Sequence, residues 1–350
     1  MKIYLVLFVE LLFIGVIFNF IIATWLFRFK LFKAFECLLY AFPVALAIIG
    51  LMLYYLFIIA GGLPSWVYIF VICLFFIILY LFSYRLHIPL LHAVVLSLKG
   101  LNNKSAKKKI FILITGILII WMAYDLVRSA FIYPLMNHDC LEYALMAKHY
   151  ALHCSFDFVK HPFIESNYFY YVGLHAPAFP LLGSFEQLIN QIFGIQSDLF
   201  FRLLTVFPGI FILLVLAYHL NSINPAYSMT GICALFFTGS FNYLIYDYHI
   251  DMYRISLVCV AFICMLYVFH LKNYNGFLLF GFIAGLQAHA HTLGLFIGLI
   301  EFFWLILLIR WPLRNKLVTG IFAFILFLAG GAVHYIIDSI AGTGWLFKLI

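Results

Sequence analysis

Charged residues are scarce in this chain of 350 residues. Asp, Glu, Lys and Arg together make up 9% of it, whereas they make up about a quarter of an ordinary soluble domain. Hydrophobic residues make up 67%, with 42 Phe and 23 Tyr among them. So little polar surface excludes a soluble globular protein, and the sequence predicts an all-α polytopic membrane protein.

Three further absences narrow the class of protein. The seven cysteines contain no CxxC pair of the metal-binding type, although Cys140 and Cys154 share one polar loop and could form a disulfide. The chain shows no internal repeat, whereas many transporters are built from two related halves. The first apolar run is long, has no basic residue before it except Lys2, and is followed by positive charge, which argues against a cleavable signal peptide.

Long apolar runs are abundant, and each is long enough to cross about 30 Å of hydrocarbon. They cover approximately residues 3–27, 37–60, 66–83, 110–133, 199–220, 228–246, 252–270, 277–290, 292–309 and 317–337. We therefore expect about ten transmembrane helices.

The charges are segregated between the two sides of this ten-span arrangement. Four connections on one side hold 13 of the 20 Lys and Arg residues: Arg28, Lys30, Lys33, Arg85, Lys99, Lys104, Lys107, Lys108, Lys109, Lys272, Arg310, Arg314 and Lys316. Nine of the 13 acids lie on the other side: Asp139, Glu142, Asp157, Glu165, Glu186, Asp198, Asp247, Asp251 and Asp338. Because basic loops stay in the cytoplasm, the net charge of +7 indicates topology rather than a nucleic-acid partner, and we expect the chemistry on the extracytoplasmic side.

Two parts are expected along the chain. Residues 1–109 would form three transmembrane helices followed by a cytoplasmic basic linker that begins as an interfacial helix. Residues 110–350 would form one span, an exported loop at 134–198, and six more spans. A loop of that length in a compact membrane protein usually carries function.

The exported loop contains two helical patterns. In "HDCLEYALMAKHY" the residues Leu141, Ala144, Leu145, Lys148 and Leu152 share one face, while Asp139, Glu142, Tyr143, Met146 and Tyr150 share the other. The second pattern, "FPLLGSFEQLINQIFG", ends at Gly194, a usual helix stop. We expect two helices on the membrane surface, the first with its acids toward water or a cleft.

Two polar clusters on the acidic side could carry chemistry. Asp139 and Glu142, three residues apart on a helix, could provide a general base or bind a metal, but acids are also common in the first turn of any helix. "YDYHIDMYR" (246–254) places Asp247, His249, Asp251 and Arg254 together, which suits an anion or metal site, although loops between spans are polar in any case.

Other polar residues are candidates for which a structural role is also expected. His289 and His291 are two apart and point to different helix faces, so we expect them at an interface or in the core. Glu301 lies within a span, where an ionisable group is expensive and often functional. Several cations could hold a phosphate or anchor the interface: Arg128, Lys148, Lys160, Arg202 and Arg254.

In layout and motifs, residues 110 to about 340 resemble the GT-C superfamily of integral-membrane glycosyltransferases, in particular protein O-mannosyltransferases and aminoarabinose transferases. "HDCLEYALMAKHY" is similar to the acid-bearing helix of that family, and "GLHAPAFPLLGSFEQLINQIFGIQSDLFFRLL" to its second juxtamembrane helix and the span that follows. "YHIDMYRISLVCVAF" and "GFLLFGFIAGLQAHAHTLGLFIGL" resemble the second acidic position and a Gly-rich helical pair. The residues that match are Asp139, Tyr143, Ala144, His175, Pro177, Arg202 and Asp251.

The resemblance implies a seven-helix module with juxtamembrane helices in its exported loop. It also implies an inverting transfer of a sugar from a polyprenyl-phosphate donor to a lipid, polysaccharide or protein acceptor. Asp139 would be the general base and Asp251 its supporting acid, with Arg202 and Arg254 at the donor phosphate. The remaining substrate-binding candidates are Glu142, Tyr143, His175 and His249.

The chain departs from the family at several points, and two of them bear on its function. Cys140 follows Asp139 where the family has Glu, so a divalent metal, if one is used, would need Glu142 or His249. The chain also stops at "IAGTGWLFKLI", soon after the seventh helix of the module. Two alternatives therefore stay open: a transporter or flippase for a lipid-linked substrate, and a truncated, inactive member of the family. We expect a multi-pass protein of a bacterial inner membrane in contact with membrane lipid.

Overall fold

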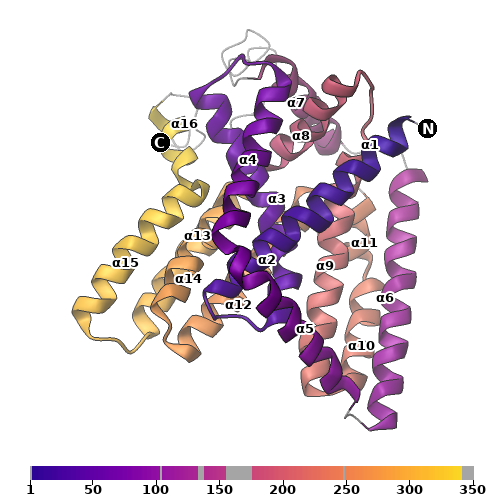
Figure 1. The fold of residues 1–350 in the computed structure, drawn as a ribbon, viewed down its shortest axis with the longest axis vertical. Coiled ribbons are helices and arrows are strands. Elements are labelled where there is room, and N and C mark those ends of the chain that lie inside the picture. The colour runs from indigo at the N-terminus through magenta and orange to yellow at the C-terminus, as the bar shows by residue number, and fades with distance from the viewer. Residues whose placement is uncertain (1, 103–104, 133–137, 155–175, 247–248, 341–350) are drawn as a thin grey trace.

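The computed structural model describes residues 2–102, 105–132, 138–154, 176–246 and 249–340. Every element of regular structure within these ranges is a helix (Figure 1). The prediction of an all-α protein is confirmed for the part of the chain that is described.

The N-terminal part forms long helices. It contains α1 (Lys2–Leu11), a π-helical segment η1 (Leu12–Phe18), α2 (Asn19–Arg28), α3 (Ala34–Ile59), α4 (Ser65–Ser83), a 3₁₀ turn η2 (Tyr84–Leu86) and α5 (His87–Asn102). The first three elements form one continuous helix, and α4 continues through η2 into α5 as far as Gly100. The interfacial helix expected before the basic linker is thus the direct extension of a span.

The second part contains the remaining helices. They are α6 (Ala106–Ile132), α7 (His138–His153), α8 (Ala178–Phe193), α9 (Leu199–Ile223), α10 (Pro225–Phe236), α11 (Gly239–Tyr246), α12 (Ile250–Leu271), α13 (Tyr274–Ala290), α14 (Thr292–Leu308), α15 (Leu313–Phe327), the π-helical η6 (Leu328–Ala332) and α16 (Val333–Ile340). All ten apolar runs of the sequence lie on these helices and those of the first part.

Seven helices among the described residues are long and apolar enough to cross a membrane, or eight if α10 and α11, which meet at a bend of 60°, form one broken span. This shows a polytopic membrane protein. The predicted count of ten is not confirmed, because α13 and α14 have only 17 residues each, fewer than a bilayer usually requires.

The two parts of the chain share one hydrophobic core. Helix α3 of the first part packs against α8, α9, α12 and α13 of the second, and residues from all these helices belong to the same buried cluster. The sequence boundary at residue 109 therefore separates two stretches of chain and not two separately packed units.

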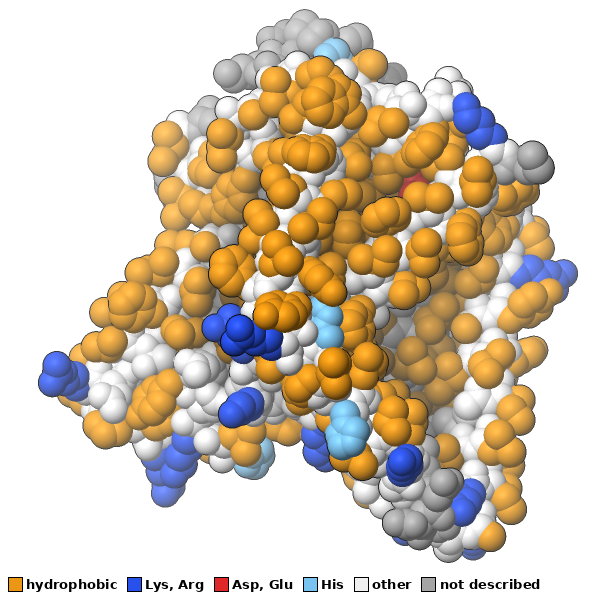
Figure 2. Space-filling model, viewed as in Figure 1, with side chains coloured by type: hydrophobic (Ala, Val, Ile, Leu, Met, Phe, Trp, Pro, Cys, Tyr) orange, Lys and Arg blue, Asp and Glu red, His pale blue; other side chains and the backbone are white. Residues whose placement is uncertain are grey.

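The two ends of the helix assembly differ in charge. The connections from α2 to α3, α5 to α6, α12 to α13 and α14 to α15 lie toward the lower end in Figure 1, and α7 and α8 lie at the opposite end. Most Lys and Arg side chains visible in Figure 2 accordingly lie in the lower half of the view. We call the two ends the basic end and the acidic end.

Helices α7 and α8 pack against each other at the acidic end. The prediction that the second helix stops at Gly194 is confirmed, since this glycine has a φ of 58° and its amide bonds back to the last turn of α8. The expectation that α8 lies on the surface is wrong: most of its residues between Ala178 and Asn190 are buried, because α3, α4 and α9 cover it.

Candidate functional site

The first turn of α12 gathers three of the residues singled out in the sequence. The Asp251 carboxylate lies 3.1 Å from Nδ1 of His249 and 2.8 Å from a guanidinium nitrogen of Arg254. All three side chains are partly exposed, at 21%, 24% and 15%. Their predicted clustering is confirmed, and one carboxylate is shared by two cationic or cation-forming groups. We call these three residues the α12 triad.

The reason for this local arrangement lies in the helix start. An acid in the first turn complements the positive end of the helix dipole, and Arg254 follows Asp251 at i+3, on the same face of α12. His249 is the N-cap residue, with extended backbone that turns its ring toward Asp251.

His291 is a fourth member that the sequence did not reveal. It is the N-cap of α14, where its Nδ1 accepts a hydrogen bond from the Leu293 amide at 3.0 Å, and it lies within electrostatic reach of Asp251. Forty residues separate these two positions in the chain, so only the antiparallel packing around α13 brings them together. His289 instead lies in the core, as expected, with 1% of its surface exposed.

Helix α7 is connected to the α12 triad through a row of aromatic rings. The ring of Tyr143 on α7 lies 5.6 Å from that of Phe179 on α8, which in turn lies 6.1 Å from that of Tyr253 on α12. Tyr253 directly precedes Arg254. The acid-bearing helix of the loop and the acidic start of α12 therefore belong to one packed region.

Tyr143 is buried between α7 and α8 and contributes to their packing. Only 2% of its surface is exposed, and with Met146 and Tyr150 it forms the face of α7 that packs on α8, while Leu141, Leu145 and Leu152 are 44%, 54% and 71% exposed. The division of α7 into two faces is confirmed, but the aromatic face meets protein and not water. The proposed contact of Tyr143 with substrate stays a prediction.

Two predicted residues of the site lie wholly or partly outside the part of the chain that the structure describes. Asp139 lies in the first turn of α7, but its side chain is outside the described residues, and so is the whole of His175. Lys160 and Asp247 are outside them as well. Glu142 is half-buried on α7.

Arg202 is engaged by an acid of its own helix start. Its guanidinium contacts Asp198 at 2.9 and 3.1 Å and reaches the Ala130 carbonyl at 3.5 Å, which ties the start of α9 to the end of α6. Arg202 was expected to bind the donor phosphate together with Arg254. The structure shows that each of these two arginines already contacts a carboxylate.

Glu186 is a structural carboxyl that the sequence pattern did not explain. Its two oxygens accept hydrogen bonds from the amides of Phe200 and Phe201 at 3.0 and 2.9 Å, so α8 caps the N-terminus of α9. Burial raises the pKa of Glu186 to about 8, although the two amides favour its charged form.

The described residues contain no candidate metal centre. No group of three or more His, Cys, Asp and Glu side chains there has the arrangement of a metal site, and the candidates Glu142 and His249 lie on different elements, α7 and the start of α12. No disulfide joins Cys140 to Cys154.

Comparisons with models of protein families, with curated proteins and with solved structures found no match for this chain.

Proposed function

We propose that the protein is an inverting membrane glycosyltransferase of the GT-C type that moves a sugar from a polyprenyl phosphate to an acceptor at its acidic end. The observation that carries the proposal is the aromatic contact from Tyr143 through Phe179 to Tyr253. It brings the two acidic positions of the resemblance, on α7 and at the start of α12, into one region.

The proposed topology has ten membrane spans. It takes α10 with α11 as one broken span and the short helices α13 and α14 as one span each. The basic end faces the cytoplasm of a bacterial inner membrane, because its connections hold most of the Lys and Arg residues. The acidic end, with α7 and α8, is then extracytoplasmic.

The proposed mechanism assigns one task to each of three charged residues, Asp139, Asp251 and Arg254. Asp139 accepts the proton of the acceptor hydroxyl as that oxygen attacks the anomeric carbon, and the bond from this carbon to the donor phosphate breaks. Asp251 holds Arg254 in place. A guanidinium has five N–H donors, so the contact of Arg254 with Asp251 at 2.8 Å engages only part of its capacity, and the rest can stabilise the departing phosphate.

Sugar transfer by membranes that contain the full chain tests the proposal. The assay uses a radiolabelled polyprenyl-phosphate sugar pool and compares wild type with Asp139→Asn at equal protein levels. We expect transfer by the wild type and its loss in the variant, because an amide cannot act as the base.

Asp125→Asn is the matched control, because Asp125 is an acid of α6 whose described contact is a 3.2 Å hydrogen bond from Tyr246. It should transfer at nearly the wild-type rate. Equal rates for wild type and Asp139→Asn would refute the assignment of the base. Movement of a lipid-linked substrate across proteoliposomes, independent of Asp139, would replace the proposal with the transporter alternative.

A further inference from the structure

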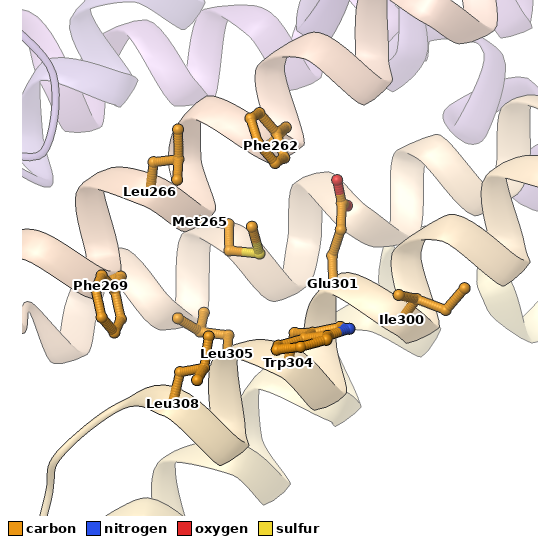
Figure 3. A pocket seen from close by; sticks show the side chains of 9 residues that line it. All are labelled: Phe262, Met265, Leu266, Phe269, Ile300, Glu301, Trp304, Leu305 and Leu308. Carbon is orange, nitrogen blue, oxygen red and sulfur yellow. The ribbon is translucent and has the colours of Figure 1, made fainter.

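A pocket of about 390 Å³ lies between the second halves of α12 and α14. Its walls are Phe262, Met265, Leu266 and Phe269 from α12 and Ile300, Glu301, Trp304, Leu305 and Leu308 from α14 (Figure 3). Several of these side chains are also on the outer surface of the protein: Phe262 is 47%, Trp304 55% and Ile300 57% exposed. The pocket therefore opens sideways, toward the hydrocarbon that surrounds membrane-spanning helices.

Glu301 is the one ionisable residue among the nine that form the wall. Its side chain rises from α14 toward Phe262 of the facing helix (Figure 3), and only 6% of its surface is exposed. Gln287 of α13 is a polar neighbour of this carboxyl group, and its amide nitrogen donates to the Gly294 carbonyl at 3.2 Å. The Oε2 atom of Glu301 has no hydrogen-bond donor among the residues that the structure describes.

An acceptor of this kind is expensive inside a membrane. No water competes for it there, and each unsatisfied polar group is destabilising. The surrounding walls are aliphatic and aromatic, and a bound molecule with a hydrogen-bonding group can provide the partner that Oε2 lacks among the described residues. That molecule must otherwise be apolar to fit the walls.

We infer that this pocket is a binding site for a membrane-soluble amphiphile: an apolar body with one hydrogen-bond donor, a hydroxyl or an amine, which it places on Oε2 of Glu301. The ligand enters from the bilayer between α12 and α14. Apolar packing on Phe262, Met265 and Trp304 supplies most of the affinity, and the carboxyl selects for the donor.

This site is separate from the region of the proposed sugar transfer. Asp251 lies in the first turn of α12, whereas the pocket begins at Phe262, about 16 Å further along the helix axis at 1.5 Å per residue. It continues toward the basic end, as far as Leu308, the last residue of α14. The inference does not depend on the proposed function.

Binding of three matched probes to the full chain in nanodiscs tests the inference. The probes are radiolabelled dodecanol, dodecylamine and methyl laurate, which are respectively a neutral donor, a cationic donor and a molecule of similar apolar length without a donor. We expect dodecanol or dodecylamine to bind saturably and methyl laurate about tenfold more weakly, as loss of one hydrogen bond in an apolar site predicts.

Two variants separate the parts of the site. Glu301→Leu should abolish the preference for the donor probes, and Leu266→Trp, which keeps the carboxyl and fills the pocket, should abolish saturable binding of all three. Glu10→Leu is the matched control, because Glu10 is another membrane-helix carboxyl, 2% exposed, and does not line the pocket; it should bind like wild type.

The outcomes distinguish a specific site from an unspecific apolar surface. Equal binding of methyl laurate and the donor probes would show an apolar groove without a role for Glu301. No saturable binding of any probe to the wild type, or undiminished binding to Leu266→Trp, would overturn the site. Whether dodecanol or dodecylamine binds more tightly identifies the donor as neutral or cationic.

Discussion

The acidic end and the flank formed by α12, α13, α14 and α15 differ in the partners of their carboxyl groups. At the acidic end, Asp198, Asp251 and Glu186 each contact two nitrogens. On the flank, Glu301 is more deeply buried than Asp251 but has one oxygen without a donor in the described residues. Glu186 and Glu301 are both buried, at 1% and 6% exposed, but they differ in whether each oxygen has a donor among the described residues. Burial alone therefore does not show which carboxyl group has capacity left for a ligand.

The same two regions also differ in how their helices are joined. Caps and ion pairs join the helix starts at the acidic end, where α8 caps α9. The flank relies on close backbone approach: a Cβ added at Gly281 of α13 would lie 2.2 Å from the Ala323 carbonyl of α15, and one at Gly285 would lie 2.2 Å from that of Phe327. Small residues that admit such contacts are typical of helix pairs in membranes.

Under the proposed function, the largest effect after that of Asp139→Asn is expected at the α12 triad. Asp251→Asn should reduce sugar transfer by about 10²-fold, the usual scale for loss of an electrostatic group in an active site, because an amide cannot hold His249 and Arg254 as the carboxylate does. Initial rates at equal amounts of folded protein, judged by gel filtration, measure this. A rate within twofold of the wild type would show that the α12 triad is only structural.

A large loss of stability is expected when a methyl group is added at the close contact between α13 and α15. Gly281→Ala should lower the free energy of unfolding by about 1–3 kcal/mol, since the new methyl group has to displace backbone. Thermal unfolding in detergent measures it. Gly116→Ala in α6, where nothing lies within 4 Å of the added carbon, is the control and should be neutral or slightly stabilising; similar losses in both would contradict the close-contact explanation.

The cap between α8 and α9 predicts a pH dependence of stability. Burial raises the pKa of Glu186 from its usual 4.5 to about 8. Between these two pH values the carboxyl group is protonated in the folded protein and ionised in the unfolded chain. The stabilisation that comes from the higher pKa of Glu186 in the folded state is fully present below pH 4.5. As the pH rises from 4.5 toward 8, the free energy of unfolding falls by at most about 1.4 kcal/mol per pH unit.

Melting temperatures of wild type and Glu186→Gln between pH 4.5 and 8.5 measure that dependence. The variant titrates no group at this position, and its melting temperature should fall less steeply over the range. Parallel curves for the two proteins would mean that Glu186 keeps one protonation state throughout.

The smallest effect is expected at the half-exposed ion pair of α9. Asp198→Asn removes the partner of Arg202, and because the side chains are 18% and 37% exposed, water screens their attraction. We expect a loss of stability below about 1 kcal/mol and little change in transfer. A change as large as that of Asp251→Asn would place Arg202 in the reaction site.

Much of the fold followed from local sequence properties. The ten apolar runs all became helices, and α8 ends before Gly194. The α12 triad was also predictable, because His249 and Arg254 each lie within one turn of Asp251 in the sequence. The burial of α8 was not predictable, since its amphipathic pattern looks the same whether its apolar face meets lipid or α3.

The sequence by itself determined that this is a helical membrane protein with a basic and an acidic end, because hydropathy and charge act segment by segment. Only the tertiary structure decided that Tyr143 faces α8, that Glu186 caps α9, that His291 lies near Asp251, and that the Oε2 atom of Glu301 lies in an apolar pocket. Each of these depends on contacts between helices far apart in the chain, and one-dimensional spacing contains no information on which helix packs against which.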